Sequence, residues 1–130
     1  MPDFGSLGLS VAAAVGAAAA APERRTVVII GDGGLMMALP DLDLLYRSGL
    51  PVLVIVMNDG VYGAEYPHLR RINASLRPAT FDSRSIADIA SAIGISSAVL
   101  AEGGSFDNLA EAVADQSGPR LVDVRCSLPS

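Results

Sequence analysis

The fold of this chain is indicated by residues 26–63, which read TVVIIGDGGLMMALPDLDLLYRSGLPVLVIVMNDGVYG. The stretch opens with one aliphatic run, Thr26–Ile30, and nearly closes with another, Val52–Met57. Such runs without polar alternation are typical of strands that a parallel sheet buries on both faces. Between them, leucines at helical spacing predict a helix over Leu35–Arg47, with Gly49 and Pro51 at its end. The stretch therefore predicts a β-α-β unit.

The same alternation continues on both sides of this unit. Helices are expected at Leu9–Ala21, Ser85–Ile93 and Phe106–Ala114, and further strands at Ser97–Ala101 and Leu121–Val124. Val61–Thr80 has no clean period and contains two prolines, so it is expected to be one long loop. The order of elements predicts an α/β fold, a three-layer domain with a mainly parallel sheet flanked by helices on both faces.

Length and composition restrict the classes of protein to consider. The 130 residues suffice for a single domain over residues 1–130, and 51% of them are hydrophobic, which excludes a disordered chain. The net charge of −5 argues against nucleic acid as a partner. All nine basic residues are arginines, so mechanisms that need a lysine amine are excluded.

The cellular location is predicted from the one cysteine and the one long apolar segment. Cys126 has no partner for an intrachain disulfide, which favours a cytoplasmic protein. The apolar segment from Val11 to Ala21 is too short to span a bilayer, and no positive charge precedes it as in a signal peptide. We therefore expect no association with a membrane.

Polar loops follow the two aliphatic runs, and each contains an aspartate, Asp32 in one and Asp59 in the other. Ligands of parallel sheets bind where such loops converge at the carboxyl ends of the strands. The backbone N–H groups of Gly33 and Gly34 are suited to phosphate oxygens, and Mg²⁺ between phosphate and carboxylates would remove their repulsion. The alternative is that Asp32 is an ordinary turn or N-cap aspartate. A dinucleotide-binding fingerprint is disfavoured, because Met36 stands where its third glycine should be.

Residues 31–63 resemble the diphosphate-binding motif of thiamine diphosphate-dependent enzymes of the pyruvate decarboxylase and acetolactate synthase type. That motif begins with GDG and ends with paired asparagines, and its metal aspartate lies 27 positions before the second asparagine, as Asp32 lies before Asp59 (59 − 32 = 27). Upstream, GSLGLSVAAAVGAAAAAPERR resembles the family's helix entry, and downstream GPRLVDVRC resembles its closing strand. The resemblance implies the C-terminal diphosphate-binding domain, without its first strand and without the pyrimidine-binding and central domains.

The resemblance also implies roles for individual residues. Three would bind Mg²⁺, namely the side chains of Asp32 and Asp59 and the carbonyl of Val61. Four would hold the diphosphate: Gly33, Gly34, Tyr62 and Gly63. Leu7 would support the bent cofactor from below, and the carbonyl of Gly5 would accept a hydrogen bond from its aminopyrimidine.

Two features depart from the family's pattern or lie just beyond it. Asp59 replaces the second asparagine, which adds a negative charge but keeps an oxygen ligand for Mg²⁺. His68 stands where acetolactate synthases usually carry tryptophan, so the superfamily is better supported than that reaction. His68 is expected to be solvated. Arg70 and Arg71 could pair with a keto-acid carboxylate or contact a neighbouring subunit, or be solvated.

The function implied is binding of thiamine diphosphate and Mg²⁺ in an enzyme that decarboxylates or ligates 2-keto acids. The glutamate that activates the cofactor in this family lies on the pyrimidine-binding domain, so the chain is expected to be inactive alone and to need that domain or subunit as a partner. A homo-oligomer is also expected. Two non-enzymatic alternatives stay open: a phosphate-binding or regulatory α/β module, and an interaction domain whose acidic loops are only turns.

Overall fold

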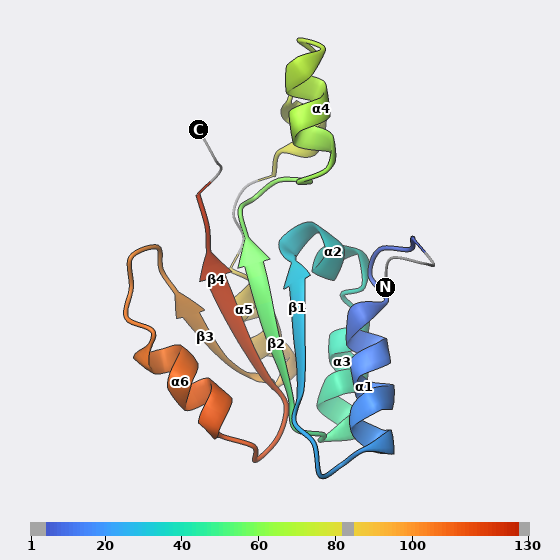
Figure 1. The fold of residues 1–130 in the computed structure, drawn as a ribbon, viewed down its shortest axis with the longest axis vertical. Coiled ribbons are helices and arrows are strands. Elements are labelled where there is room, and N and C mark those ends of the chain that lie inside the picture. Colours follow the sequence, from blue (N-terminus) through green and yellow to red (C-terminus); the bar gives the residue numbers. More distant parts are fainter. Residues whose placement is uncertain (1–4, 82–84, 128–130) are drawn as a thin grey trace.

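The computed structural model describes residues 5–81 and 85–127, and within them lies a four-stranded parallel sheet. Residues 1–4, 82–84 and 128–130 of the expected domain lie outside the described residues. The strand order is β1-β2-β4-β3 (Figure 1). The strands are β1 Thr26–Gly31, β2 Val52–Asn58, β3 Ser96–Leu100 and β4 Arg120–Arg125. Each lies within one residue of the run predicted for it at either end, and the α/β fold with a parallel sheet is confirmed.

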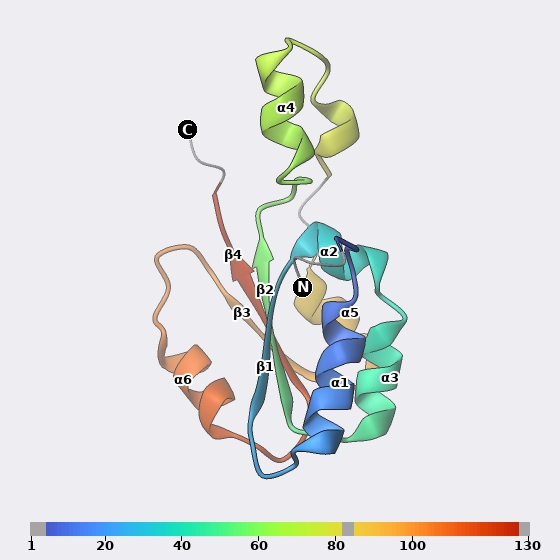
Figure 2. The same ribbon diagram turned by 45° about the vertical axis from the view of Figure 1, so that its right-hand side comes forward.

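One face of the sheet carries the larger core. Helices α1 (Ser10–Ala20), α3 (Asp41–Ser48) and α5 (Ile86–Ile93) cover this face (Figure 2). The alanines of α1 allow close approach to the sheet, and the helix buries Val11, Ala14 and Ala18. None of the helices in the described part of the chain is long and apolar enough to cross a membrane.

The opposite face is covered only in part. Helix α6 (Asp107–Ala114) packs here, and the small core beneath it contains Leu53, Leu100 and Val122. The edge strand β1 leaves the side chain of Ile29 69% exposed and that of Val27 about half exposed. The prediction that Thr26–Ile30 is buried on both faces is therefore wrong. The composition of a strand reports its apolar character, but its place at the sheet edge decides what covers it.

The prediction of a single helix over Leu35–Arg47 is also wrong. The chain forms two helices there, α2 (Asp32–Met37) and α3, separated by a turn at residues 38–40. Pro40 explains the break, because proline cannot donate a backbone hydrogen bond and disfavours helical geometry in the residue before it. The predicted end of α3 is confirmed at Gly49, whose φ is +64°.

The long loop predicted over Val61–Thr80 contains a helix, α4 (Glu65–Arg71), and a short 3₁₀ turn, η1 (Arg77–Ala79). Pro67 does not prevent α4, because it lies in the first turn, where its missing N–H has no helical partner to lose. Helix α4 projects beyond the carboxyl edge of the sheet (Figures 1 and 2), and none of its residues is buried. At the base of this excursion, the Tyr62 amide donates to the Ala79 carbonyl at 2.9 Å.

Candidate functional site

The loops after β1 and β2 lie side by side at the carboxyl edge of the sheet. The parallel register pairs Gly31 with Met57, so the chain leaves both strands at the same level. Asp32 is then the first residue of α2, while Asn58 ends β2 and Asp59 follows it. The two aspartates singled out in the sequence therefore belong to adjacent loops, as the parallel arrangement predicted.

The Asp32 carboxylate connects these two loops. The side chain is 2% exposed, its Oδ1 accepts a hydrogen bond from the Gly33 amide at 2.8 Å, and its Oδ2 accepts one from the Gly60 amide at 2.9 Å. Sequence reasoning did not include Gly60 in the site. The signal available was the Asn-Asp-Gly turn, and the structure shows why glycine is required there: its φ is +73°, and an added Cβ would lie 3.1 Å from the Phe81 carbonyl oxygen.

Burial raises the pKa of Asp32, and the nearby charge of Asp59 raises it further. The hydrogen bonds from the Gly60 and Gly33 amides act in the opposite direction and lower this pKa. A buried carboxylate next to another carboxylate is an environment that a divalent cation would stabilise.

The loop after β2 turns tightly at Asp59. The Asp59 Oδ1 accepts a hydrogen bond from the Val61 amide at 3.2 Å, and this bond closes an Asx turn. Val61 also pairs with Thr80 in an isolated antiparallel bridge, which joins the beginning and the end of the excursion that contains α4. The backbone around Val61 is thus held on both sides.

A cavity of about 230 Å³ lies between the two loops. It brings together every residue predicted for the site except Gly5, which is exposed and not among the lining residues. Leu7 reaches the cavity from the segment before α1 and is 66% exposed. The lining is formed by Leu7, Gly31, Asp32, Gly33, Gly34, Met37, Met57, Asp59, Val61, Tyr62, Gly63, Ala64 and Glu65.

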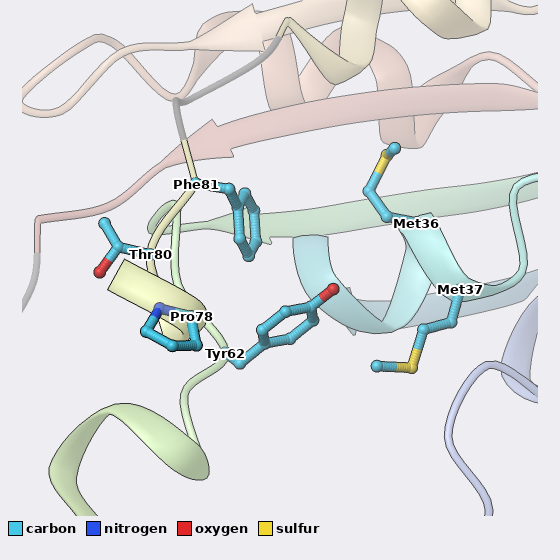
Figure 3. Close-up of a pocket in the computed structure, with 6 residues that line it drawn as sticks. All are labelled: Met36, Met37, Tyr62, Pro78, Thr80 and Phe81. Atoms are coloured by element: carbon cyan, nitrogen blue, oxygen red, sulfur yellow. The ribbon is translucent and has the colours of Figure 1, made fainter. Parts of the chain in front are cut away.

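Tyr62 forms one wall of this cavity and is packed closely. Its ring meets the Phe81 ring edge-on, with centroids 5.1 Å apart. A Cβ added to Gly33 would lie 2.8 Å from the Tyr62 ring, so only glycine allows this approach. Tyr62 and Met37 also line a second cavity of about 320 Å³, together with Met36, Pro78, Thr80 and Phe81 (Figure 3).

Of the residues of α4, Glu65 lines the cavity between the two loops, whereas His68, Arg70 and Arg71 do not. His68 is exposed, as expected, and its Nδ1 lies 3.1 Å from Nη2 of Arg71. Both residues line a third cavity of about 400 Å³ with Ala64 and Pro67. Arg70 is exposed.

The site residues fit a magnesium ion through the chemistry of their donors. No group of three or more histidine, cysteine, aspartate or glutamate side chains that could hold a metal occurs among the described residues. Mg²⁺ does not require such a group, since it is commonly bound by one or two carboxylates together with phosphate oxygens and water. Two carboxylates and the adjacent backbone carbonyl of Val61 offer oxygen donors of this type at one cavity.

Sequence reasoning missed one polar residue next to the site. Asp123 is completely buried on β4, and its Oδ1 accepts a hydrogen bond from Nδ2 of the buried Asn58 at 2.8 Å. The stretch RLVDVR could have shown it, because a carboxylate in the middle of an inner strand needs partners.

Comparisons with known proteins show the family of this chain. The family described as "Thiamine pyrophosphate enzyme, C-terminal TPP binding domain" matches residues 2–124. An alpha-keto-acid decarboxylase of Mycobacterium ulcerans is 38% identical over 135 residues, which is 98% of this chain and 22% of that protein. One from Mycobacterium tuberculosis H37Rv is 36% identical over 132 residues, 98% of this chain and 23% of that protein.

A solved structure extends the likeness to the fold. The thiamine diphosphate-dependent 4-hydroxybenzoylformate decarboxylase of Rhodococcus jostii RHA1 superposes with a TM-score of 0.81 at 25% identity, covering 95% of this chain and 24% of that one. The chain thus spans less than a quarter of the length of these relatives. It belongs to the thiamine pyrophosphate enzymes, as a member of the family of their C-terminal cofactor-binding domain.

Proposed function

We propose that this chain forms the diphosphate- and Mg²⁺-binding half of a thiamine diphosphate site in an enzyme that acts on 2-keto acids. The observation that carries the proposal is the cavity between the two loops, which gathers Asp32, Asp59 and four of the glycines around one space. Its position at the carboxyl ends of parallel strands is the usual one for a ligand of this fold.

In this proposal the metal is held by the carboxylates of Asp32 and Asp59 and the carbonyl of Val61. The Gly33 and Gly60 amides already orient Asp32, so little rearrangement is needed to bind a cation. A bound cation would offset both the burial and the mutual repulsion that raise the pKa of Asp32.

The diphosphate would lie against Gly33, Gly34, Tyr62 and Gly63. A Cβ added to Gly63 would meet no atom within 4 Å, so the backbone there is open to a bulky anion. Leu7 lines the same cavity and would support the cofactor, and the carbonyl of Gly5 would bind its aminopyrimidine.

The reaction proposed is decarboxylation, with carboligation as a second outcome of the same chemistry. Thiamine diphosphate, when bound, supplies the electron sink that cleavage next to a keto group needs. The two mycobacterial relatives are alpha-keto-acid decarboxylases, which favours decarboxylation over an acetolactate synthase-like reaction. A pyrimidine-binding domain would complete the site, so we propose that the chain is inactive without it. The active enzyme is proposed to be a homo-oligomer in the cytoplasm.

Calorimetric titration of the chain with thiamine diphosphate tests the binding site. We expect heat of binding with Mg²⁺ and none without it. Asp32→Ala should abolish that heat, whereas Asp43→Ala should retain it, because Asp43 is exposed on α3 and paired with Arg47 at 2.8 Å. Equal binding by the Asp32 variant would refute the metal site.

A second assay separates an enzyme from a binding module. The chain is mixed with a pyrimidine-binding domain from a related decarboxylase, and CO₂ release from 2-keto acids is measured. Cofactor binding without CO₂ release in any mixture would favour a non-catalytic phosphate-binding module. Release of CO₂ by the chain alone would contradict the proposed dependence on a partner.

A further inference from the structure

Asp123 is a buried carboxylate to which the proposed function gives no role. It lies on β4, opposite Val56 of β2 and Val99 of β3, with no exposed surface. It does not line the cavity between the two loops. A carboxylate in such a place is costly unless its oxygens are well bonded, so its partners show what it holds.

One of its oxygens holds the end of β2. Oδ1 of Asp123 accepts the hydrogen bond from Nδ2 of Asn58, and the Asn58 carbonyl in turn accepts one from the Cys126 amide at 3.0 Å. Asn58 directly precedes Asp59 and Gly60. Anchoring Asn58 therefore fixes the start of the turn, and this turn directs the Gly60 amide at Asp32.

The other oxygen holds the beginning of α5. Oδ2 of Asp123 accepts from the Ile86 amide at 3.0 Å and lies 3.4 Å from the Ala87 amide. The same oxygen forms an ion pair with Nη2 of Arg125 at 3.0 Å. A carboxylate at this position satisfies N–H groups that the first turn of a helix leaves without partners.

These two anchors lie at opposite ends of one excursion of the chain. The segment from Asn58 to Ile86 contains the turn at Asp59, one wall of the cavity and the projecting helix α4. Helix α4 buries none of its residues, so it contributes little packing that could hold the segment in place. Near the base, the Phe81 amide donates to the Gly60 carbonyl at 2.9 Å.

We propose that Asp123 is a positioning residue, which fastens both ends of the segment between Asn58 and Ile86 and thereby fixes the turn at Asp59 and Gly60 against Asp32. It touches neither the cavity nor a ligand, and it acts through Asn58 and through the start of α5. Its effect on the turn stands without a ligand. Only its effect on affinity rests on the proposed function.

Hydrogen exchange of the ligand-free chain tests the positioning directly. In Asp123→Ala, exchange at the Gly60 amide should accelerate by about tenfold relative to the Val54 amide in β2, since a lost buried acceptor loosens the turn locally. The control is Val122→Ala, a buried neighbour on the same strand, which should accelerate both amides by the same factor. Equal factors for the two amides in Asp123→Ala would reduce Asp123 to a structural residue and overturn the proposal.

Titration with Mg²⁺ and thiamine diphosphate gives the second readout. Asp123→Ala should weaken binding by about tenfold, which corresponds to the loss of one buried hydrogen bond, because the loosened turn carries Asp59 and Val61. Val122→Ala should leave the Kd within about twofold. Should Asp123→Ala fail to fold, Asn58→Ala removes the hydrogen bond to Oδ1 and leaves the Oδ2 bond to the start of α5, and it should show the same selective exchange at Gly60. Absence of binding by the unmodified chain would refute the proposed function, while the exchange result would still decide the role of Asp123.

Discussion

The backbone amide of Gly60 donates a hydrogen bond to the carboxylate of Asp32 across 2.9 Å, joining the loops that follow two neighbouring strands. Gly60 reaches this position with a φ of +73°. The aspartate is buried, so the bond forms away from solvent, where an unmet acceptor would be costly. The geometry of the cavity thus depends on a glycine that has no side chain to contribute.

Gly60→Ala is expected to destabilise the chain by about 1–2 kcal/mol, because a side chain disfavours the left-handed conformation and the added Cβ would crowd the Phe81 carbonyl. Urea unfolding measures the change. Gly63→Ala serves as the control, since its Cβ would meet no atom within 4 Å, and its stability should change by less than about 0.5 kcal/mol. Equal losses in the two variants would contradict this account.

Gly33→Ala should also destabilise, by about 1–3 kcal/mol, although alanine favours helices, because its Cβ would overlap the Tyr62 ring. Gly16→Ala in α1 should have the opposite sign and stabilise by about 0.5–1 kcal/mol, since nothing lies within 4 Å of its Cβ. Thermal unfolding of both variants checks the pair. Stabilisation by Gly33→Ala would show that Tyr62 does not pack as described.

The uncovered face of β1 predicts self-association. Val27 and Ile29 are exposed there, and the exposed Met57 of β2 pairs with Gly31, two residues beyond Ile29. Ile29→Lys should shift the chain toward the monomer in sedimentation at micromolar concentration, because it places a charge in the apolar contact between copies. The stability of the fold should change little, because Ile29 is exposed. Val99→Lys on the opposite edge strand, at a site of similar exposure to Val27, is the control. An unchanged distribution for Ile29→Lys would exclude this face as the contact.

Asp115 gives a prediction for the dependence of stability on pH. The hydrogen bond from the Ser117 amide, with help from Arg120, holds the pKa of Asp115 below its usual 3.8. A lowered pKa stabilises the fold fully above about pH 4, and this contribution is lost as pH falls through the lower, folded value. The difference in unfolding free energy between the original chain and Asp115→Asn should therefore shrink below pH 4. A difference that is constant from pH 7 to pH 2 would contradict the assignment.

The strands and the helices α1, α5 and α6 follow from local sequence. Aliphatic runs bounded by glycine and proline predicted β1 and β2 closely, because burial of such runs is their main requirement. The break between α2 and α3 was missed, although Pro40 marks it, since periodic leucines continue across the turn. The exposure of Ile29 could not be predicted, because it depends on which strand lies at the edge of the sheet.

The site was predicted in part for a different reason. Motif spacing placed Asp32 and Asp59 in adjacent loops, and parallel pairing brought them to one cavity. The roles of Gly60 and Asp123 were missed because they act through hydrogen bonds to residues 28 and 65 positions away. Such long-range bonds leave no periodic pattern in the sequence. The binding of Mg²⁺ and cofactor at Asp32 and Asp59 stays a prediction.

The stability of the fold depends little on the sequence of the projecting helix α4. Because its side chains take no part in the core, replacements along Glu65–Arg71 carry little penalty in folding free energy. The same segment starts beside the cavity, where Ala64 and Glu65 form part of the lining. The sequence of this segment can therefore vary, and with it the side chains at the entrance of the cavity, while the sheet that carries the segment stays the same.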